Sequence, residues 1–84
     1  MVFRVLVSKK ATKFITQTES VLGDRLREKI RLLSEPTLVD CVKIKGEDNL
    51  FRTRVGDYRI LFLIFTQEKL VIVVKIDKRS RVAN

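Results

Sequence analysis

The chain has 84 residues, which is enough for one domain and too few for two. Hydrophobic residues make up 45% and charged residues 33% of the sequence, a balance that excludes a disordered segment and indicates a folded domain. The formal net charge of +8 favours a polyanionic partner: nucleic acid, an acidic protein or a lipid surface.

Cysteine and histidine usage limits the chemistry of the chain. Cys41 is the single cysteine, so an intramolecular disulfide is excluded, and we expect its side chain to be small, apolar and buried. Without histidine a Cys/His zinc site is excluded, and we expect no metal and no cofactor. The start of the chain, interrupted by Arg4, does not fit a signal peptide, and no apolar run reaches membrane-spanning length. We therefore expect a soluble cytoplasmic protein with no membrane partner.

The first half of the chain predicts one strand followed by two helices. Residues 2–7 are β-branched and aromatic, as strands are, and Ser8 is a good N-cap for the helix that follows. The apolar residues of this helix fall near helical spacing: Ala11, Phe14, Ile15 and Leu22. We expect Gly23 to end the first helix and Asp24 to cap a second, which Glu35–Pro36 stops. The apolar face of the second helix consists of Leu26, Ile30 and Leu33.

From Leu38 onward the pattern changes to strands. The candidate segments are LVDCVKIKG, LFRTRV, YRILFLIF and KLVIVVKI, residues 38–46, 50–55, 58–65 and 69–76. The order is thus one strand, two helices, then three or four strands in a meander. It predicts a single α+β domain over residues 1–84, with the helices packed on one face of a mostly antiparallel sheet.

The segment FRTRVGDYRI, residues 51–60, concentrates arginine around a hairpin turn. Its Gly-Asp pair suits a two-residue type II′ turn, in which glycine takes the positive φ. That turn sets Arg54 opposite Arg59, and strand alternation then places Arg52 on the same face and Tyr58 on the core face. Like charges directly opposite one another destabilise a sheet, so the arrangement favours an anion-binding site over a solvated surface.

The C-terminal segment KIDKRSRVAN is also basic. Continued as a strand, it would place Lys75, Asp77, Arg79 and Arg81 on one face, and the parity of the preceding turn decides whether Arg59 shares it. The alternative is a frayed basic tail. Planar, multidentate arginine is well suited to phosphate.

A basic groove can stabilise the charged state of a phosphate undergoing cleavage, but RNA cleavage also needs proton transfer. Arginine stays protonated and histidine is missing. Lysine can serve only where neighbouring arginines depress its pKa. The lysines near the arginines are Lys43, Lys45, Lys75 and Lys78.

Three motifs together resemble the RelE/ParE superfamily of toxins from type II toxin–antitoxin systems. They are VKIKG, then LFRTRVGDYRILFLI, then LVIVVKIDKRSRV. Members of the superfamily typically show K-L-x-G, Y-R-x-R-x-G-x-Y-R-[VIL] and a last strand ending in H/K-R-x-x-V-Y. The resemblance covers essentially the whole chain. It implies a RelE-like mRNA interferase, a ribosome-dependent endoribonuclease that cleaves mRNA in the A site and inhibits translation.

Carried over by motif, the catalytic residues are Arg52, Arg54, Arg59 and Arg79. They would grip the scissile phosphate and stabilise its transition-state charge. The expected RNA- and phosphate-binding residues are Lys43, Lys45, Lys75, Lys78 and Arg81. The C-terminal tyrosine credited with proton transfer in the family is replaced here by Ala83, so the resemblance assigns no general acid or base.

The partners implied by the resemblance are an acidic, RelB-like antitoxin, the ribosome and mRNA. Two alternatives stay open. One is a ParE-like toxin that inhibits DNA gyrase, and the other is a nucleic-acid-binding member with weak or no catalysis.

Overall fold

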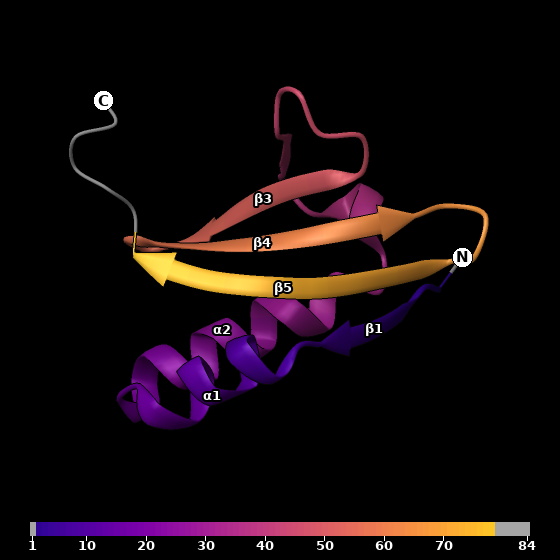
Figure 1. The fold of residues 1–84 in the computed structure, drawn as a ribbon. Helices are drawn as coiled ribbons and strands as arrows, with labels where there is room; N and C mark the ends of the chain where they lie inside the picture. The colour runs from indigo at the N-terminus through magenta and orange to yellow at the C-terminus, as the bar shows by residue number, and fades with distance from the viewer. Residues whose placement is uncertain (1, 79–84) are drawn as a thin grey trace.

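The computed structural model describes residues 2–78, which form a five-stranded sheet with two helices on one face (Figure 1). In chain order the elements are β1 (Arg4–Val7), α1 (Lys9–Gln17), α2 (Ser20–Leu32), the 3-10 helix η1 (Pro36–Leu38), β2 (Val42–Lys43), β3 (Leu50–Val55), β4 (Tyr58–Phe65) and β5 (Leu70–Lys78). The strand order is β1-β5-β4-β3-β2, with β1 parallel to β5 and every other pair antiparallel. The predicted α+β class is confirmed. No helix within residues 2–78 has the length and apolar character needed to cross a membrane.

Ser8 starts the first helix, as predicted from the sequence. Its Oγ accepts a hydrogen bond from the Ala11 N–H at 3.1 Å and donates one to the carbonyl oxygen of Val74 at 2.8 Å. One hydroxyl therefore caps α1 and ties that helix to β5.

The predicted boundary between the helices is wrong. The first helix ends at Gln17, and Gly23 lies inside α2 rather than after α1. The N-cap of α2 is Glu19, whose carboxylate accepts the N–H groups of Val21 and Leu22. Gly23 is buried against α1, where an added Cβ would lie 3.5 Å from the carbonyl oxygen of Ile15. That distance is an ordinary van der Waals contact, and Gly23 is an interior residue of α2 that does not end a helix.

The core lies between the helices and the sheet. Its fully buried large side chains are Leu26, Leu33, Ile60, Phe62, Val71 and Val73. The strand residues among them alternate with residues on the opposite face, as expected for a sheet covered on one side.

The predicted strand over residues 38–46 is shorter in the structure, only Val42–Lys43. Leu38 belongs to the 3-10 helix before it, and a turn in which Glu47 N–H donates to the Ile44 carbonyl oxygen follows it. Before that short strand, Thr53 Oγ1 donates to the carbonyl oxygen of Asp40 at 2.9 Å, so a side chain replaces a ladder hydrogen bond. Cys41 is half-buried against the core. Burial raises the pKa of its thiol, and the charge of Asp40 acts in the same direction.

The β3–β4 hairpin has the predicted register, with Arg54 opposite Arg59 and Arg52 opposite Leu61. Gly56 has φ +59°, and among residues 2–78 Lys69 is the only non-glycine with a positive φ. A positive φ at the first turn position alone is the signature of a type II′ turn.

A β-bulge interrupts the pairing of β4 with β5. Leu61 pairs with Lys75 and Phe62 pairs with Val73, so Val74 is an extra residue in β5. The bulge settles the parity left open by the sequence, because Arg59 now pairs with Asp77.

Candidate nucleic-acid interface

The outer face of the sheet, opposite α1 and α2, is divided into a charged end and an apolar end. The row nearest the hairpin turn contains Arg54, Arg59 and Asp77, paired across β3, β4 and β5. The next row contains Arg52, Leu61 and Lys75. We call Arg52, Arg54, Arg59 and Lys75 the cationic cluster.

Beyond the charged rows lies a row of four aliphatic side chains. It crosses four strands and consists of Leu6, Ile72, Leu63 and Leu50, which we call the apolar ladder. Leu6 is 48% exposed, and the other three are half-buried. The outer face therefore joins a basic surface to an apolar one.

Asp77 joins two of the cations. Arg59 Nε donates to Asp77 Oδ1 at 3.2 Å, and Lys75 Nζ lies 3.5 Å from Asp77 Oδ2. Neither Arg52 nor Arg54 forms an ion pair with any acid in the described part of the chain. These two guanidinium groups are therefore the ones most available to an anion.

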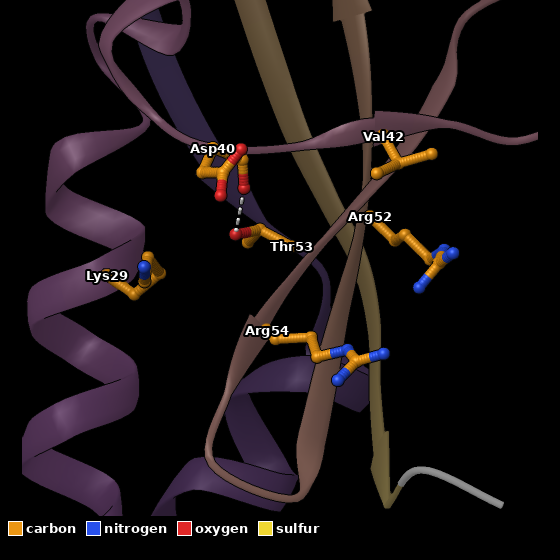
Figure 2. Close-up of a pocket in the computed structure, with 6 residues that line it drawn as sticks. All are labelled: Lys29, Asp40, Val42, Arg52, Thr53 and Arg54. Carbon is orange, nitrogen blue, oxygen red and sulfur yellow. Dashed lines mark hydrogen bonds between the residues drawn. The ribbon is translucent and has the colours of Figure 1, made fainter.

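A recess of about 360 Å³ opens beside β3, between this strand and α2 (Figure 2). Its lining residues are Lys29, Asp40, Val42, Arg52, Thr53 and Arg54. Figure 2 shows Arg52 and Arg54 extending from one side of β3, while Thr53 points toward Asp40 and Lys29 comes from the helix. Basic side chains thus border both the outer face and the edge of β3.

Sequence reasoning missed Lys29. It lies three residues after Leu26 and four before Leu33, both buried, so helical spacing puts it on the side of α2 nearest the sheet. It is half-buried, whereas the other charged residues of α2 are exposed. That spacing is the signal that could have identified it.

The structure brings only part of the predicted residue set together. The register pairs Lys43 with Phe51, which stacks on the buried Phe62, and pairs Lys78 with Tyr58. Both lysines therefore project from the helix-covered side of the sheet rather than from the outer face. Lys45 is exposed in the loop between β2 and β3. Arg79, Arg81 and Ala83 lie outside the described residues.

Tyr58 lies on the core face, as predicted, and its ring meets Phe14 edge-on with the centroids 5.6 Å apart. The phenol is therefore on the wrong side of the sheet to act at the cationic cluster. The cluster can bind phosphate and stabilise negative charge, but residues 2–78 offer no histidine or tyrosine on the outer face for proton transfer.

Three kinds of similarity identify the family. A family model described as the ParE toxin of the type II toxin–antitoxin system parDE matches residues 3–83. A relative from Methanocaldococcus jannaschii, provisionally named toxin RelE1, is 24% identical over 84 residues, which cover 95% of this chain and 93% of the relative.

Solved structures show the same fold. The RelE–RelB complex from Pyrococcus horikoshii contains a chain that is 27% identical, with a TM-score of 0.83 and coverage of 98% of this chain and 100% of that one. The RelBE2 toxin–antitoxin complex from Mycobacterium tuberculosis contains one that is 23% identical, with a TM-score of 0.80 and coverage of 94% and 100%. Together with the family model, these similarities show that the chain belongs to the ParE toxin family, within the RelE/ParE superfamily, and is a toxin of a type II toxin–antitoxin system.

Proposed function

We propose that this toxin is a RelE-like endoribonuclease that cleaves mRNA in the ribosomal A site and so inhibits translation. The cationic cluster is the observation that carries the proposal. Arg54 and Arg59 lie directly opposite each other, a pairing of like charges that does not stabilise the sheet, and Arg54 has no acid partner within residues 2–78. An RNA phosphate would supply the missing counter-charge.

In this proposal the arginines act on the scissile phosphate. Arg52, Arg54 and Arg59 hold its oxygens and stabilise the charge that develops on them when the 2′-hydroxyl attacks. Lys75 adds a further phosphate contact from β5. Arg79 is the fourth proposed catalytic residue, and Lys45 and Arg81 complete the proposed RNA-binding set. Lys43 and Lys78, expected in that set from the sequence, project from the opposite side of the sheet and are left out of it.

A ribosome assay tests the proposal. Ribosomes carrying a defined mRNA are incubated with the toxin, and cleavage is mapped by primer extension. We expect cleavage in the A-site codon that requires the ribosome and is lost in the double variant Arg52→Ala/Arg54→Ala. The matched control, Arg27→Ala/Arg31→Ala, removes two exposed arginines from α2 and should still cleave. A folded wild-type toxin that leaves the mRNA intact contradicts the proposal.

Ala83 bears on the rate. The family resemblance assigns proton transfer to a tyrosine at this position, and general acid–base catalysis typically contributes ~10²–10⁴-fold. We therefore expect Ala83→Tyr to raise the single-turnover rate on ribosomes, with Ala83→Phe as the control that lacks the hydroxyl. Equal rates for the two variants would assign proton transfer to another group, with lysine the next candidate.

A second function, inhibition of DNA gyrase, is favoured by one observation. The family model that spans residues 3–83 is that of the ParE toxin. A supercoiling assay separates the two functions: gyrase inhibition without mRNA cleavage supports the alternative, and cleavage without gyrase inhibition supports the RelE-like activity.

We further propose that an acidic, RelB-like antitoxin binds this toxin. The Pyrococcus horikoshii and Mycobacterium tuberculosis structures are themselves toxin–antitoxin complexes. The net charge of +8 and the apolar ladder beside the cationic cluster are complementary to an amphipathic acidic segment. Such a partner should raise the melting temperature of the toxin by mass action, and an unchanged melting temperature with saturating antitoxin contradicts this pairing.

A further inference from the structure

We propose that Asp77 positions Arg59 for phosphate contact and, at the same time, weakens the binding of RNA by the cationic cluster. The inference rests on the proposed function of that cluster as an RNA site. It concerns an acidic residue in a surface that otherwise favours anions.

Asp77 stands out among the acids by its position. It is the only acid in any of the five strands, and it faces Arg59 directly across the β4–β5 pair. Within residues 2–78 it is therefore the one carboxylate at a strand position on the outer face. A negative charge there repels a phosphate, so its effect on RNA affinity is unfavourable.

The contact geometry shows what Asp77 contributes. Its Oδ1 accepts from Nε of Arg59 at 3.2 Å, and its Oδ2 lies 3.5 Å from Nζ of Lys75. A guanidinium held through Nε keeps both terminal NH₂ groups free for two phosphate oxygens. Asp77 therefore fixes the direction of Arg59 without occupying the donors that a phosphate needs.

The surroundings of Arg59 make such a support necessary. Arg54 lies directly opposite on β3, and Lys75 is nearby on β5, so Arg59 has cations on two sides. Without Asp77 the guanidinium would turn away from both into solvent. The Arg59–Asp77 side chains are 29% and 26% exposed, whereas the Arg27–Asp24 pair on α2 is 55% and 81% exposed. The cross-strand pair is less screened by water and better able to hold one geometry.

Two variants separate positioning from charge. Asp77→Asn removes the charge but keeps a carbonyl oxygen that can accept from Arg59 Nε, and Asp77→Ala removes both. Asp24→Asn is the matched control, because it removes one negative charge from an exposed ion pair on α2.

The first measurement is the binding of a short single-stranded RNA, 2′-O-methylated to prevent cleavage, over a series of KCl concentrations. We expect Asp77→Asn, which removes the negative charge and keeps Arg59 in place, to bind more tightly than wild type, and Asp77→Ala to gain less because its Arg59 is no longer held. For Asp77→Asn we also expect the slope of log affinity against log salt to become steeper by about 0.7, the value for one added phosphate contact on a single strand. Asp24→Asn should change neither quantity. Weaker or unchanged RNA binding by Asp77→Asn overturns the proposal. This variant tests the effect of the Asp77 charge on RNA affinity even if Asp77→Ala fails to fold.

The second measurement is single-turnover cleavage on ribosomes. Misplacing a group that stabilises transition-state charge should lower the maximal rate of Asp77→Ala by about tenfold or more while its half-saturating concentration does not rise. Asp77→Asn should keep more of this rate than Asp77→Ala. Equal maximal rates for wild type and Asp77→Ala overturn the positioning role.

A third readout does not depend on RNA. Heteronuclear NMR of the arginine side chains should show the Arg59 Nε–H protected from solvent exchange in wild type and Asp77→Asn, and unprotected in Asp77→Ala. A protected signal in Asp77→Ala overturns the positioning role, whatever the toxin does to mRNA. Absence of RNA binding and cleavage in wild type, with this NMR pattern intact, is a failure of the proposed function and not of the Arg59–Asp77 contact.

Discussion

Two neighbouring rows of the sheet, one residue apart along each strand, have opposite roles. The row of Thr53, Ile60 and Ile76 is buried under the helices. The adjacent row of Arg54, Arg59 and Asp77 lies on the outer face. The buried row contributes to the stability of the fold. The outer row is not part of the core, so charged side chains there cost folding little free energy. A sheet covered on one side thus separates stability from chemistry by alternation alone.

The largest effect should come from the buried row. Ile60 is fully buried, so Ile60→Ala should lower the free energy of unfolding by about 2–5 kcal/mol. In a domain of this size each kcal/mol lowers the melting temperature by roughly 4–8 °C. Calorimetry checks the shift, and any loss of cleavage should follow the unfolded fraction. If Ile60→Ala has the melting temperature of wild type, the buried row does not stabilise the fold more than the outer row does.

The adjacent row should show the reverse. Arg54→Ala should lower ribosome-dependent cleavage by about a hundredfold, since it removes a donor aimed at developing phosphate charge. Its free energy of unfolding should change by less than about 0.5 kcal/mol, because Arg54 is exposed and faces another cation. Arg27→Ala, an exposed arginine on α2, is the control for charge. If Arg54→Ala unfolds, the outer row also contributes to the stability of the fold, which contradicts the comparison.

The hydroxyl of Thr53 sharpens the comparison within the buried row. Thr53→Val keeps the shape but leaves the carbonyl oxygen of Asp40 without its donor, and should cost about 1–2 kcal/mol. Thr53→Ser retains the hydroxyl and should keep more of the hydrogen-bond contribution in a denaturant titration. Equal stability of wild type and Thr53→Val would show that water satisfies the Asp40 carbonyl.

The smallest effect is expected at the β3–β4 turn, which fixes the register of both rows. Gly56 has φ +59°, so Gly56→Ala should cost about 1 kcal/mol of backbone strain. Space is not the limit, since an added Cβ would lie 3.7 Å from the nearest atom, Nη1 of Arg25. Gly56→Asn should be milder, because asparagine tolerates this φ better. A stable Gly56→Ala hairpin with an unchanged midpoint in denaturant would contradict the turn assignment.

Local rules predicted the hairpin and the Ser8 cap from the sequence because short-range backbone geometry decides both. The Gly-Asp turn fixes the register of β3 with β4, and a hydroxyl at Ser8 reaches the next turn of helix. The predicted helix boundary at Gly23 was wrong, since a buried glycine inside a helix looks the same in sequence as one that ends a helix. Tertiary contact decides between them.

The candidate site was predicted in part for similar reasons. The arginine row followed from one turn, whereas helical spacing places Lys29 only on the sheet-facing side of α2 and does not say that it lies beside β3. Lys75 and Asp77 lie on the same face as Arg59 because of a β-bulge in β5, and nothing in the sequence predicted that bulge. Strand alternation separates Lys78 from Lys75, but it does not say which of the two turns toward the helices, as Lys78 does.

The bulge at Val74 makes β5 two half-strands of opposite phase. Before it the odd-numbered Val71 and Val73 are buried, and after it the even-numbered Ile76 is buried. If Val74 were paired as a regular strand residue, without the bulge, the second half-strand would be turned over, with Lys75 and Asp77 under the helices and Ile76 in water. The bulge, and not the residue order alone, therefore keeps Lys75 and Asp77 on the outer face, and composition or motif matching would not detect its loss.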